Sequence, residues 1–295
     1  MKQEISSFWY TPKGYKGIGL MELLSIKSFI DNGYKFILYT YNLDDKIFRK
    51  LDELFDDFEL KDANEIVPFE NYFSDDRGAG VAAFSDYFRY YMLYQKDAIW
   101  VDLDMICLNY IDLNEKYIFS QELDIQADKS EKYLITTSFL KFPKKSNFGE
   151  NLIHEAEKII NKRKQIPWGV IGPWFLADQV KKWGLENFAW DYKKTCQLYH
   201  GFVEKLIYNK QIFDEQQPFI HLFSEIWRVN NLNKNYFYKY GFYRKLLERY
   251  DIKSLSKQLN LDYSDDEKIY KSLLFKKRIK YIIRQSKKFL QGYFF

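Results

Sequence analysis

The stretch FSDYFRYYMLYQKDAIWVDLDMICL, residues 84–108, decides the fold prediction. Its first half repeats aromatic and apolar side chains at helical spacing, which predicts a helix with one buried face. The apolar run at 98–101 then predicts a buried strand that delivers Asp102 and Asp104 to its end. Because alternate residues of a strand point to the same side, we expect both carboxylates on one side.

Alternating strand and helix patterns precede this stretch. Such an order predicts a parallel sheet, and parallel sheets bind ligands at the carboxyl ends of their strands. The aromatic side chains of Trp9, Tyr10 and Tyr41 fall at that edge, where they could sandwich a nucleobase or simply cap the sheet. The predicted elements are the strands 4–10 and 35–41 and the helices 21–29 and 44–58.

The acid pair at the strand end predicts a divalent-metal site. Two carboxylates held side by side repel each other unless a cation neutralises them. Oxygen ligands favour Mg²⁺ or Mn²⁺, which fill their remaining positions with water and substrate phosphate. The preceding helix adds Asp86 and Arg89, three residues apart, which form at least an intrahelical ion pair. The pattern therefore favours an enzyme that acts on a diphosphate-bearing substrate.

Composition is that of an ordinary globular enzyme, with 46% hydrophobic and 29% charged residues, and favours one large α/β domain with appended helices. Cys107 and Cys196 have no metal-site spacing and predict buried thiols in a reducing compartment. No stretch approaches the roughly 18 apolar residues of a membrane span, and no signal peptide opens the chain. We therefore expect a cytoplasmic protein.

Charge is distributed unevenly along the chain. Residues 268–295 contain nine Lys or Arg and no Asp or Glu, whereas residues 1–267 hold 36 basic and 41 acidic side chains, a net charge of −5. The basic end, Lys268–Phe295, also has apolar residues near helical spacing, which is typical of an amphipathic helix on an anionic membrane surface. A helix docked on the body with its basic face in water is equally compatible with this pattern, and nucleic acid is not expected.

Residues 84–108 also resemble the signature of the DXD-containing sugar-binding-region glycosyltransferases, family 32, which include bacterial capsule and lipopolysaccharide enzymes. The spacing is similar to that in large clostridial glucosylating toxins, since Asp102 lies 16 residues after Asp86. The resemblance covers roughly residues 4–230. Its further blocks, in family order, are LLSIKSFIDNGYKFILYTYN (23–42), TTSFLKFPKKS (136–146), WGVIGPWFLADQV (168–180) and IHLFSEIWR (220–228).

This resemblance implies a GT-A-type, Rossmann-like nucleotide-sugar-binding domain with a mixed central sheet, plus C-terminal helices. It places the catalytic domain at 1–230 and a helical extension with the basic tail at 231–295. The implied reaction is metal-dependent, retaining transfer of a hexose or N-acetylhexosamine from a UDP-sugar. The implied acceptor is a saccharide or lipid-linked oligosaccharide in lipopolysaccharide, lipooligosaccharide or capsule biosynthesis, with the inner face of the plasma membrane as a possible location.

The resemblance also implies roles for individual residues. Asp86 and Arg89 are expected to bind the donor sugar and its phosphate side, and Asp102 and Asp104 to hold Mn²⁺ or Mg²⁺ on the diphosphate. His221 or Ser224 could complete the metal shell. The residues expected to line the nucleotide or close the donor site are Phe8, Trp9, Tyr41, Trp100, His221, Ser224 and Trp227.

The sequence departs from the family pattern at three places. Asp97-Ala98 stands where the family usually has Gly-Gly, Phe223 where it has Trp, and Ser224 where Asn is commoner. Two of these departures, Phe223 and Ser224, fall in the block from which the resemblance implies a contact with the metal or phosphate.

Different functions share parts of this pattern. A strand ending in Asp-x-Asp also begins haloacid-dehalogenase-type phosphatases, but Met105-Ile106-Cys107 lacks the small hydroxyl residues of that class. A toxin-like transferase that modifies protein and a noncatalytic carbohydrate-binding protein are two more hypotheses. Residues 168–173 could form an acceptor-side loop or a plain turn.

Overall fold

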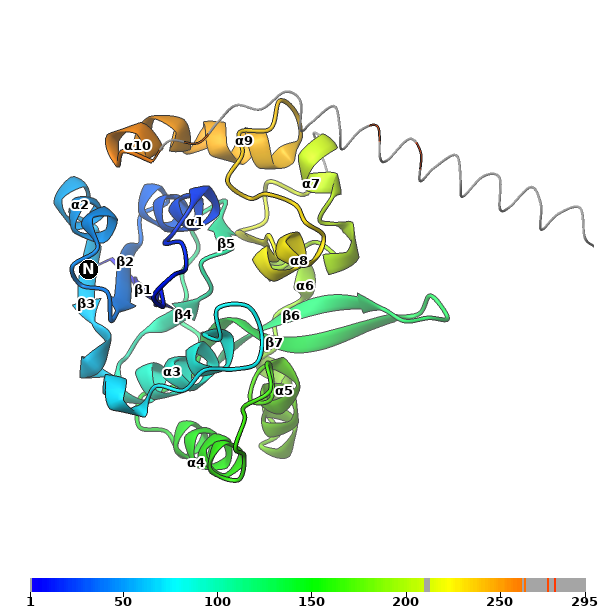
Figure 1. Cartoon of the computed structure of the whole chain (residues 1–295). Helices are drawn as coiled ribbons and strands as arrows, with labels where there is room; N and C mark the ends of the chain where they lie inside the picture. The colour runs from blue at the N-terminus through cyan, green and yellow to red at the C-terminus, as the bar shows by residue number, and fades with distance from the viewer. Residues whose placement is uncertain (1, 210–212, 262, 264–274, 276–278, 280–295) are drawn as a thin grey trace, which may run out of the picture.

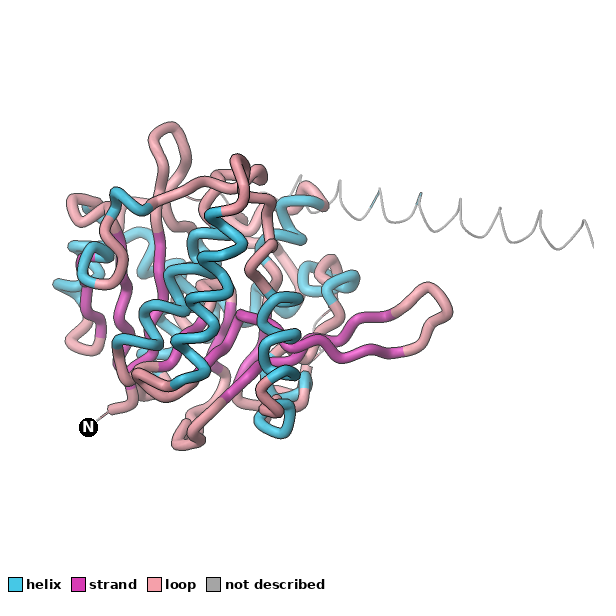
Figure 2. Tube along the Cα trace, turned by 90° about the horizontal axis from the view of Figure 1, so that it is seen from below, coloured by secondary structure: helices cyan, strands magenta, loops and turns pink. Residues whose placement is uncertain are grey.

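The computed structural model describes residues 2–209, 213–261, 263, 275 and 279, and has a mixed α/β architecture (Figures 1 and 2). The strands of this part are β1 (Glu4–Trp9), β2 (Lys35–Thr40), β3 (Phe58–Asp62), β4 (Ile99–Val101), β5 (Met105–Cys107), β6 (Ile118–Ile125), β7 (Glu131–Lys141) and β8 (Phe219–His221). Its α-helices are α1 (Leu20–Asp31), α2 (Lys46–Leu54), α3 (Ala82–Gln95), α4 (Asn147–Asn161), α5 (Pro173–Lys182), α6 (Tyr192–Thr195), α7 (Lys205–Tyr208), α8 (Ser224–Val229), α9 (Phe242–Arg249) and α10 (Ile252–Gln258).

The central sheet has the strand order β3-β2-β1-β4-β7-β6. Strands β1 to β4 run parallel, and the order β3-β2-β1-β4 is that of a Rossmann-like half sheet. Strand β7 pairs antiparallel with β4, placing Trp100 opposite Leu140, and β6 forms a hairpin with β7 that projects from the body in Figure 1. The predicted Rossmann-like α/β fold with a mixed central sheet is therefore confirmed.

The helix predicted over residues 44–58 is wrong in its last part. Helix α2 ends at Leu54, the next residue, Phe55, has extended backbone, and Phe58 already begins β3. The sequence of β3, FELKD, alternates Phe58 and Leu60 with charged residues over only five positions, and β3 is an edge strand that pairs with β2 on one side. A charged edge strand therefore looked like the polar face of a longer helix.

Both faces of the sheet are covered, which suits strands that are apolar on both sides. On one face, Ile5 and Phe36 pack in a core that also contains α1, β5, β8, α9 and α10. On the other face, Phe8 and Tyr39 pack against α3, α4 and α5. Figure 2, seen from below the view of Figure 1, shows helices lying in front of the strands on this side of the sheet.

The C-terminal helices α9 and α10 share the core of the first face. The hydroxyl of Tyr250 donates to the Cys107 carbonyl, and Arg249 Nη2 donates to the Leu108 carbonyl at 2.6 Å, so α9 is tied to the end of β5. The domain boundary between residues 230 and 231 stays a prediction.

The amphipathic tail predicted over Lys268–Phe295 lies outside the described residues, apart from positions 275 and 279. Among the described residues, no helix combines the length and apolar character that a membrane span requires. Cys107 and Cys196 are buried free thiols, as predicted.

Candidate active site

The acid pair lies in a tight turn at the carboxyl end of β4. The strand ends at Val101, and the Met105 amide donates to the Asp102 carbonyl at 3.0 Å, so the chain turns through Asp102 to Asp104 before β5 begins. The two aspartates therefore lie in a turn. The alternation expected for a strand does not apply to them. Their carboxylates converge nevertheless, because one oxygen of each lies within a 4.8 Å cluster that also contains a His221 ring nitrogen.

Arg89 neutralises the acidic side chains nearest to β4. Its Nη1 lies 2.9 Å from Asp102 Oδ1, and its Nη2 lies 3.2 Å from Asp86 Oδ1. Nη1 also donates to the Thr137 carbonyl at 2.7 Å, and the guanidinium carbon lies 4.6 Å from the centre of the Trp100 ring. Helix α3 and strands β4 and β7 therefore hold one buried cation between two carboxylates.

Trp100 contributes a second contact to the first aspartate of the pair. Its Nε1 donates to Asp102 Oδ1 at 2.9 Å, the same oxygen that Arg89 contacts. Within the described residues, the polar contacts of the Asp102 side chain fall on Oδ1, and this side chain is 28% exposed. Oδ2 is therefore the oxygen that is placed to meet a ligand.

Asp104 is held by residues more than a hundred positions downstream. Strand β8 pairs with β5 in a register that sets His221 opposite Met105, and His221 Nε2 lies 3.1 Å from Asp104 Oδ1. Phe223 then takes a left-handed backbone, φ 56°, and turns the chain into α8. The Ser224 amide, at the start of α8, donates to Asp104 Oδ2 at 2.7 Å.

The three carboxylates of this cluster differ in the direction of their pKa shifts. Burial raises the pKa of Asp86 to about 6, although Arg89 opposes the shift. Burial likewise raises the pKa of Asp102, with Arg89 opposing and Asp104 adding to the increase. Burial also acts to raise the pKa of Asp104, but the His221 imidazolium and the Ser224 amide outweigh it and hold that pKa well below its usual range.

His221 carries the compensating positive charge. Burial lowers the pKa of its imidazole, but the attraction of Asp104 and the contacts with Cys196 and Glu122 raise that pKa well above its usual value. Nδ1 lies 3.2 Å from Glu122 Oε1, at ion-pair distance but outside hydrogen-bond geometry. The protonated His221 imidazole thus supplies positive charge beside Asp104.

Two members of this cluster, Glu122 and Cys196, were missed by the sequence analysis. Their side-chain ligand atoms lie within 4.8 Å of each other and of a His221 nitrogen. Glu122 comes from β6 and Cys196 follows α6, so neither belongs to a local motif. The pairing of β8 with β5 brings the His221 imidazole to these two residues. No single segment of the sequence therefore indicates this cluster.

The predicted nucleotide-lining residues lie in different surroundings. Phe8 is 5% exposed and stacks on Phe88 at 4.4 Å, and Trp227 is fully buried, its Nε1 donating to the Leu222 carbonyl at 2.9 Å. Both are core residues in this structure.

Trp9 and Tyr41 are partly buried and pack against opposite cores of the sheet. The Tyr41 hydroxyl donates to the Val67 carbonyl at 2.6 Å. A contact of any of these four aromatic residues with a nucleotide stays a prediction.

The residues at the carboxyl end of β4 fit a divalent cation. Asp102, Asp104 and His221 offer two oxygens and one nitrogen within 4.8 Å, a donor set compatible with Mn²⁺ or Mg²⁺. Ser224 adds its main-chain amide to Asp104 at the same place. If a divalent cation replaced the proton on His221, its two positive charges would balance the two negative charges of Asp102 and Asp104.

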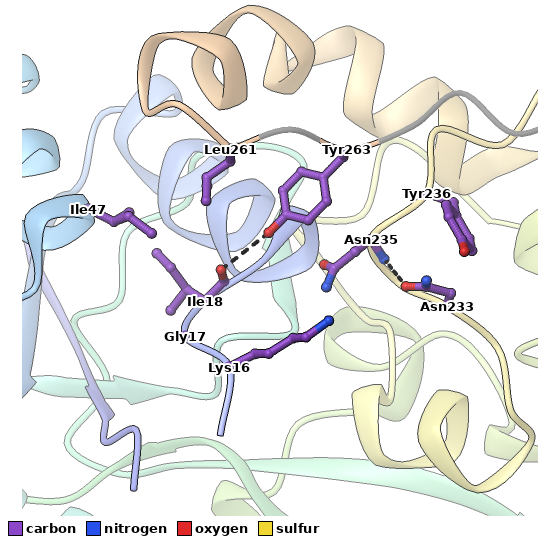
Figure 3. A pocket seen from close by; sticks show the side chains of 9 residues that line it. All are labelled: Lys16, Gly17, Ile18, Ile47, Asn233, Asn235, Tyr236, Leu261 and Tyr263. Carbon is purple, nitrogen blue, oxygen red and sulfur yellow. Dashed lines mark hydrogen bonds between the residues drawn. The ribbon is translucent and has the colours of Figure 1, made fainter. Parts of the chain in front are cut away.

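A separate hollow of about 450 Å³ lies beside the start of α1 (Figure 3). Its lining includes Lys16, Asn233, Tyr236 and Tyr263. Asn235 Oδ1 accepts a hydrogen bond from the Leu20 amide at its edge, at 3.0 Å. The predicted site residues do not line this hollow.

Comparisons with known proteins give a fold likeness. No protein-family model matches the chain, and no curated protein matches it. Among solved structures, the chain is similar to the PaToxG glycosyltransferase, with 13% identity over 61% of this chain and 69% of that chain, at a TM-score of 0.44. Any conclusion about activity therefore depends on the geometry of the site.

Proposed function

We propose that this chain is a metal-dependent glycosyltransferase of the GT-A type that uses a nucleotide sugar. The observation that supports this most directly is the convergence of Asp102, Asp104 and His221 within 4.8 Å at the carboxyl end of a parallel strand. Ligands of Rossmann-like sheets bind at that edge. Beside it, Arg89 supplies a buried cation that pairs with Asp102 and Asp86.

The proposed roles follow from these positions. A bound Mn²⁺ or Mg²⁺ supplies positive charge to the diphosphate of the donor. Asp102 and Asp104 would hold the cation, and His221 would orient Asp104 from the β8 side. Arg89 keeps Asp102 ionised, and Asp86 lies beside it to accept hydrogen bonds from sugar hydroxyls. Preorganised charge of this kind is the main contribution that a protein makes to group transfer.

We further propose the finer features that the family resemblance implies. The donor is a UDP-sugar that carries a hexose or N-acetylhexosamine, and transfer retains the anomeric configuration. The acceptor is a saccharide or lipid-linked oligosaccharide of bacterial lipopolysaccharide, lipooligosaccharide or capsule. The reaction takes place in the cytoplasm, with Lys268–Phe295 as a contact for anionic lipid.

A phosphatase function fits the site less well. In such an enzyme the second aspartate of the pair, here Asp104, acts as acid and base and must take up a proton. Both of its oxygens are instead engaged, by His221 at 3.1 Å and by the Ser224 amide at 2.7 Å, and its pKa is held well below its usual range. A toxin-like transferase that modifies protein would use the same donor site and differ only in its acceptor.

The test is a UDP-release assay with a panel of UDP-sugars and Mn²⁺, run with and without EDTA. We expect turnover of one donor, loss of turnover in EDTA, and a fall of at least about a hundredfold in Asp104→Asn. Asp56→Asn, an exposed residue after α2, is the matched control and should leave turnover unchanged. Near-normal activity of Asp104→Asn would refute the metal role, and absence of both turnover and UDP-sugar binding would refute the proposed function.

A further inference from the structure

The loop before α5, residues 166–172, is fixed along helix α3. Ile166 forms a parallel bridge with Asp75, and the Trp168 amide donates to Asp76 Oδ1 at 2.8 Å. At the other end of the loop, the Ile171 carbonyl accepts a hydrogen bond from the Tyr90 hydroxyl at 2.7 Å. The loop is thus held at both ends beside the helix that carries Asp86 and Arg89.

The end of this loop touches the candidate donor site. A Cβ built on Gly172 would lie 2.8 Å from Asp86 Oδ2, closer than two such atoms can approach, so any other residue here would have to displace that carboxylate or the chain. Pro173 begins α5 immediately afterwards, and Trp174 follows it. Trp174 therefore lies two residues from a direct contact with the Asp86 carboxylate.

The start of the loop reaches the other side of the same site. The guanidinium carbon of Arg77 lies 4.3 Å from the centre of the Trp168 ring, and Arg77 Nη1 lies 3.8 Å from Glu225 Oε1. Glu225 follows Ser224, whose amide donates to Asp104. Direct contacts thus connect the loop to Asp86 at one end and to the helix that holds Asp104 at the other.

Both indoles are exposed, although Trp168 lies in this fixed loop and Trp174 lies in the first turn of α5. Trp168 is 41% exposed and Trp174 is 61% exposed. Exposed indole faces are costly in water, and flat aromatic faces suit the apolar faces of pyranose rings. Trp183, at the other end of α5, is 40% exposed but packs on Phe148, at a ring distance of 5.9 Å.

We propose that Trp168 and Trp174 form the platform that binds the acceptor, and that the acceptor is a saccharide whose rings stack on these indoles. This inference rests on the proposed function, because the platform borders the donor site. It favours an oligosaccharide acceptor over a protein acceptor, since two exposed indoles flank Gly172 in the sequence and Lys132 and Arg77, which lie 5.3 and 4.3 Å from the centres of the Trp174 and Trp168 rings, can donate to sugar oxygens beside them. Trp168 and Trp174 are thus binding residues for the acceptor and not for the donor.

The experiment compares Trp168→Ala, Trp174→Ala and their double variant with Trp183→Ala as the matched control. The probe is an array of bacterial surface oligosaccharides, incubated with labelled protein, UDP and Mn²⁺. An oligosaccharide that the wild-type protein retains then serves as the acceptor for kinetics. For each protein, transfer to this acceptor and hydrolysis of the UDP-sugar to water are measured side by side, and thermal unfolding confirms the fold.

We expect each single variant to raise the acceptor KM at least tenfold and to lower the ratio of transfer to hydrolysis. Trp174→Tyr should recover part of the loss because it restores a ring face, and Trp183→Ala should match the wild type. Unchanged acceptor KM in the double variant would overturn the inference, as would a wild-type enzyme that hydrolyses UDP-sugar but retains no oligosaccharide. Absence of hydrolysis and of UDP-sugar binding in the wild type would instead refute the proposed function itself.

Discussion

Arg89→Met removes the positive charge that two carboxylates share. Arg89 Nη1 and Nη2 lie 2.9 Å from Asp102 and 3.2 Å from Asp86, and the side chains of Arg89 and Asp86 are only 5% and 8% exposed. Removing one partner of a buried ion pair costs about 3–5 kcal/mol. Methionine replaces much of the arginine stem, so packing changes little. We therefore expect the free energy of unfolding at pH 8 to fall by about 3–5 kcal/mol.

The same substitution should cost less in acid. Burial raises the pKa of Asp86 from its ordinary 3.8 to about 6 in the folded protein, even with Arg89 present. A raised pKa means that this group's contribution to stability is present below about pH 4 and is lost as the pH rises through about 6. Without Arg89 the pKa of Asp86 rises further, so the loss between pH 5 and pH 8 becomes larger in the variant.

Urea unfolding followed by circular dichroism, at pH 5 and pH 8 with EDTA present, measures both effects. Arg49→Met is the matched control, because Arg49 is 61% exposed and its partner Asp44 is 98% exposed. An exposed pair of this kind contributes about 0–1 kcal/mol. A loss below about 1 kcal/mol for Arg89→Met at pH 8, or an equal loss at both pH values, would refute the reasoning.

Three further substitutions test neighbouring parts of the structure. Gly172→Ala should slow UDP release in a steady-state assay at least about tenfold, because its Cβ must displace Asp86 Oδ2 from 2.8 Å; unchanged turnover would contradict that close approach. Trp100→Phe removes the Nε1 donor to Asp102 and should lower the free energy of unfolding in urea by about 1.5–3 kcal/mol, whereas an unchanged midpoint would show the hydrogen bond to be unimportant. Gly241→Ala combines a φ of 100° with a Cβ 2.2 Å from a main-chain carbonyl of α7, and thermal unfolding should show a loss above about 3 kcal/mol; a midpoint equal to that of the wild type would argue against the strain.

The parts of the fold that were predictable are those with a local pattern. Helix α3 and strand β4 have clear helical and apolar signals, and Asp102 and Asp104 follow β4 directly. Strand β3 has only a five-residue alternation with three charged residues, which is too short to separate it from the end of the preceding helix. Local pattern also misled in detail, since the acid pair occupies a turn and not the strand itself.

The rest of the site depends on contacts between distant segments. His221 reaches Asp104 only because β8 pairs with β5, and the family resemblance, not periodicity, drew attention to it. Glu122 and Cys196 reach His221 from a hairpin strand and from the end of a four-residue helix. Sequence spacing carries no information on such contacts before the topology is known, so these two residues could not be predicted.

The pairing of β5 with β8 also sets the time at which the site can exist. During synthesis, Asp102 and Asp104 leave the ribosome long before Phe219–His221, and the β4 end then lacks the imidazole and the Ser224 amide that hold Asp104. A nascent chain, or a proteolytic fragment that stops before β8, therefore presents two adjacent carboxylates without their partners. The surroundings of Asp104 are therefore completed by a segment that is synthesised more than a hundred residues later.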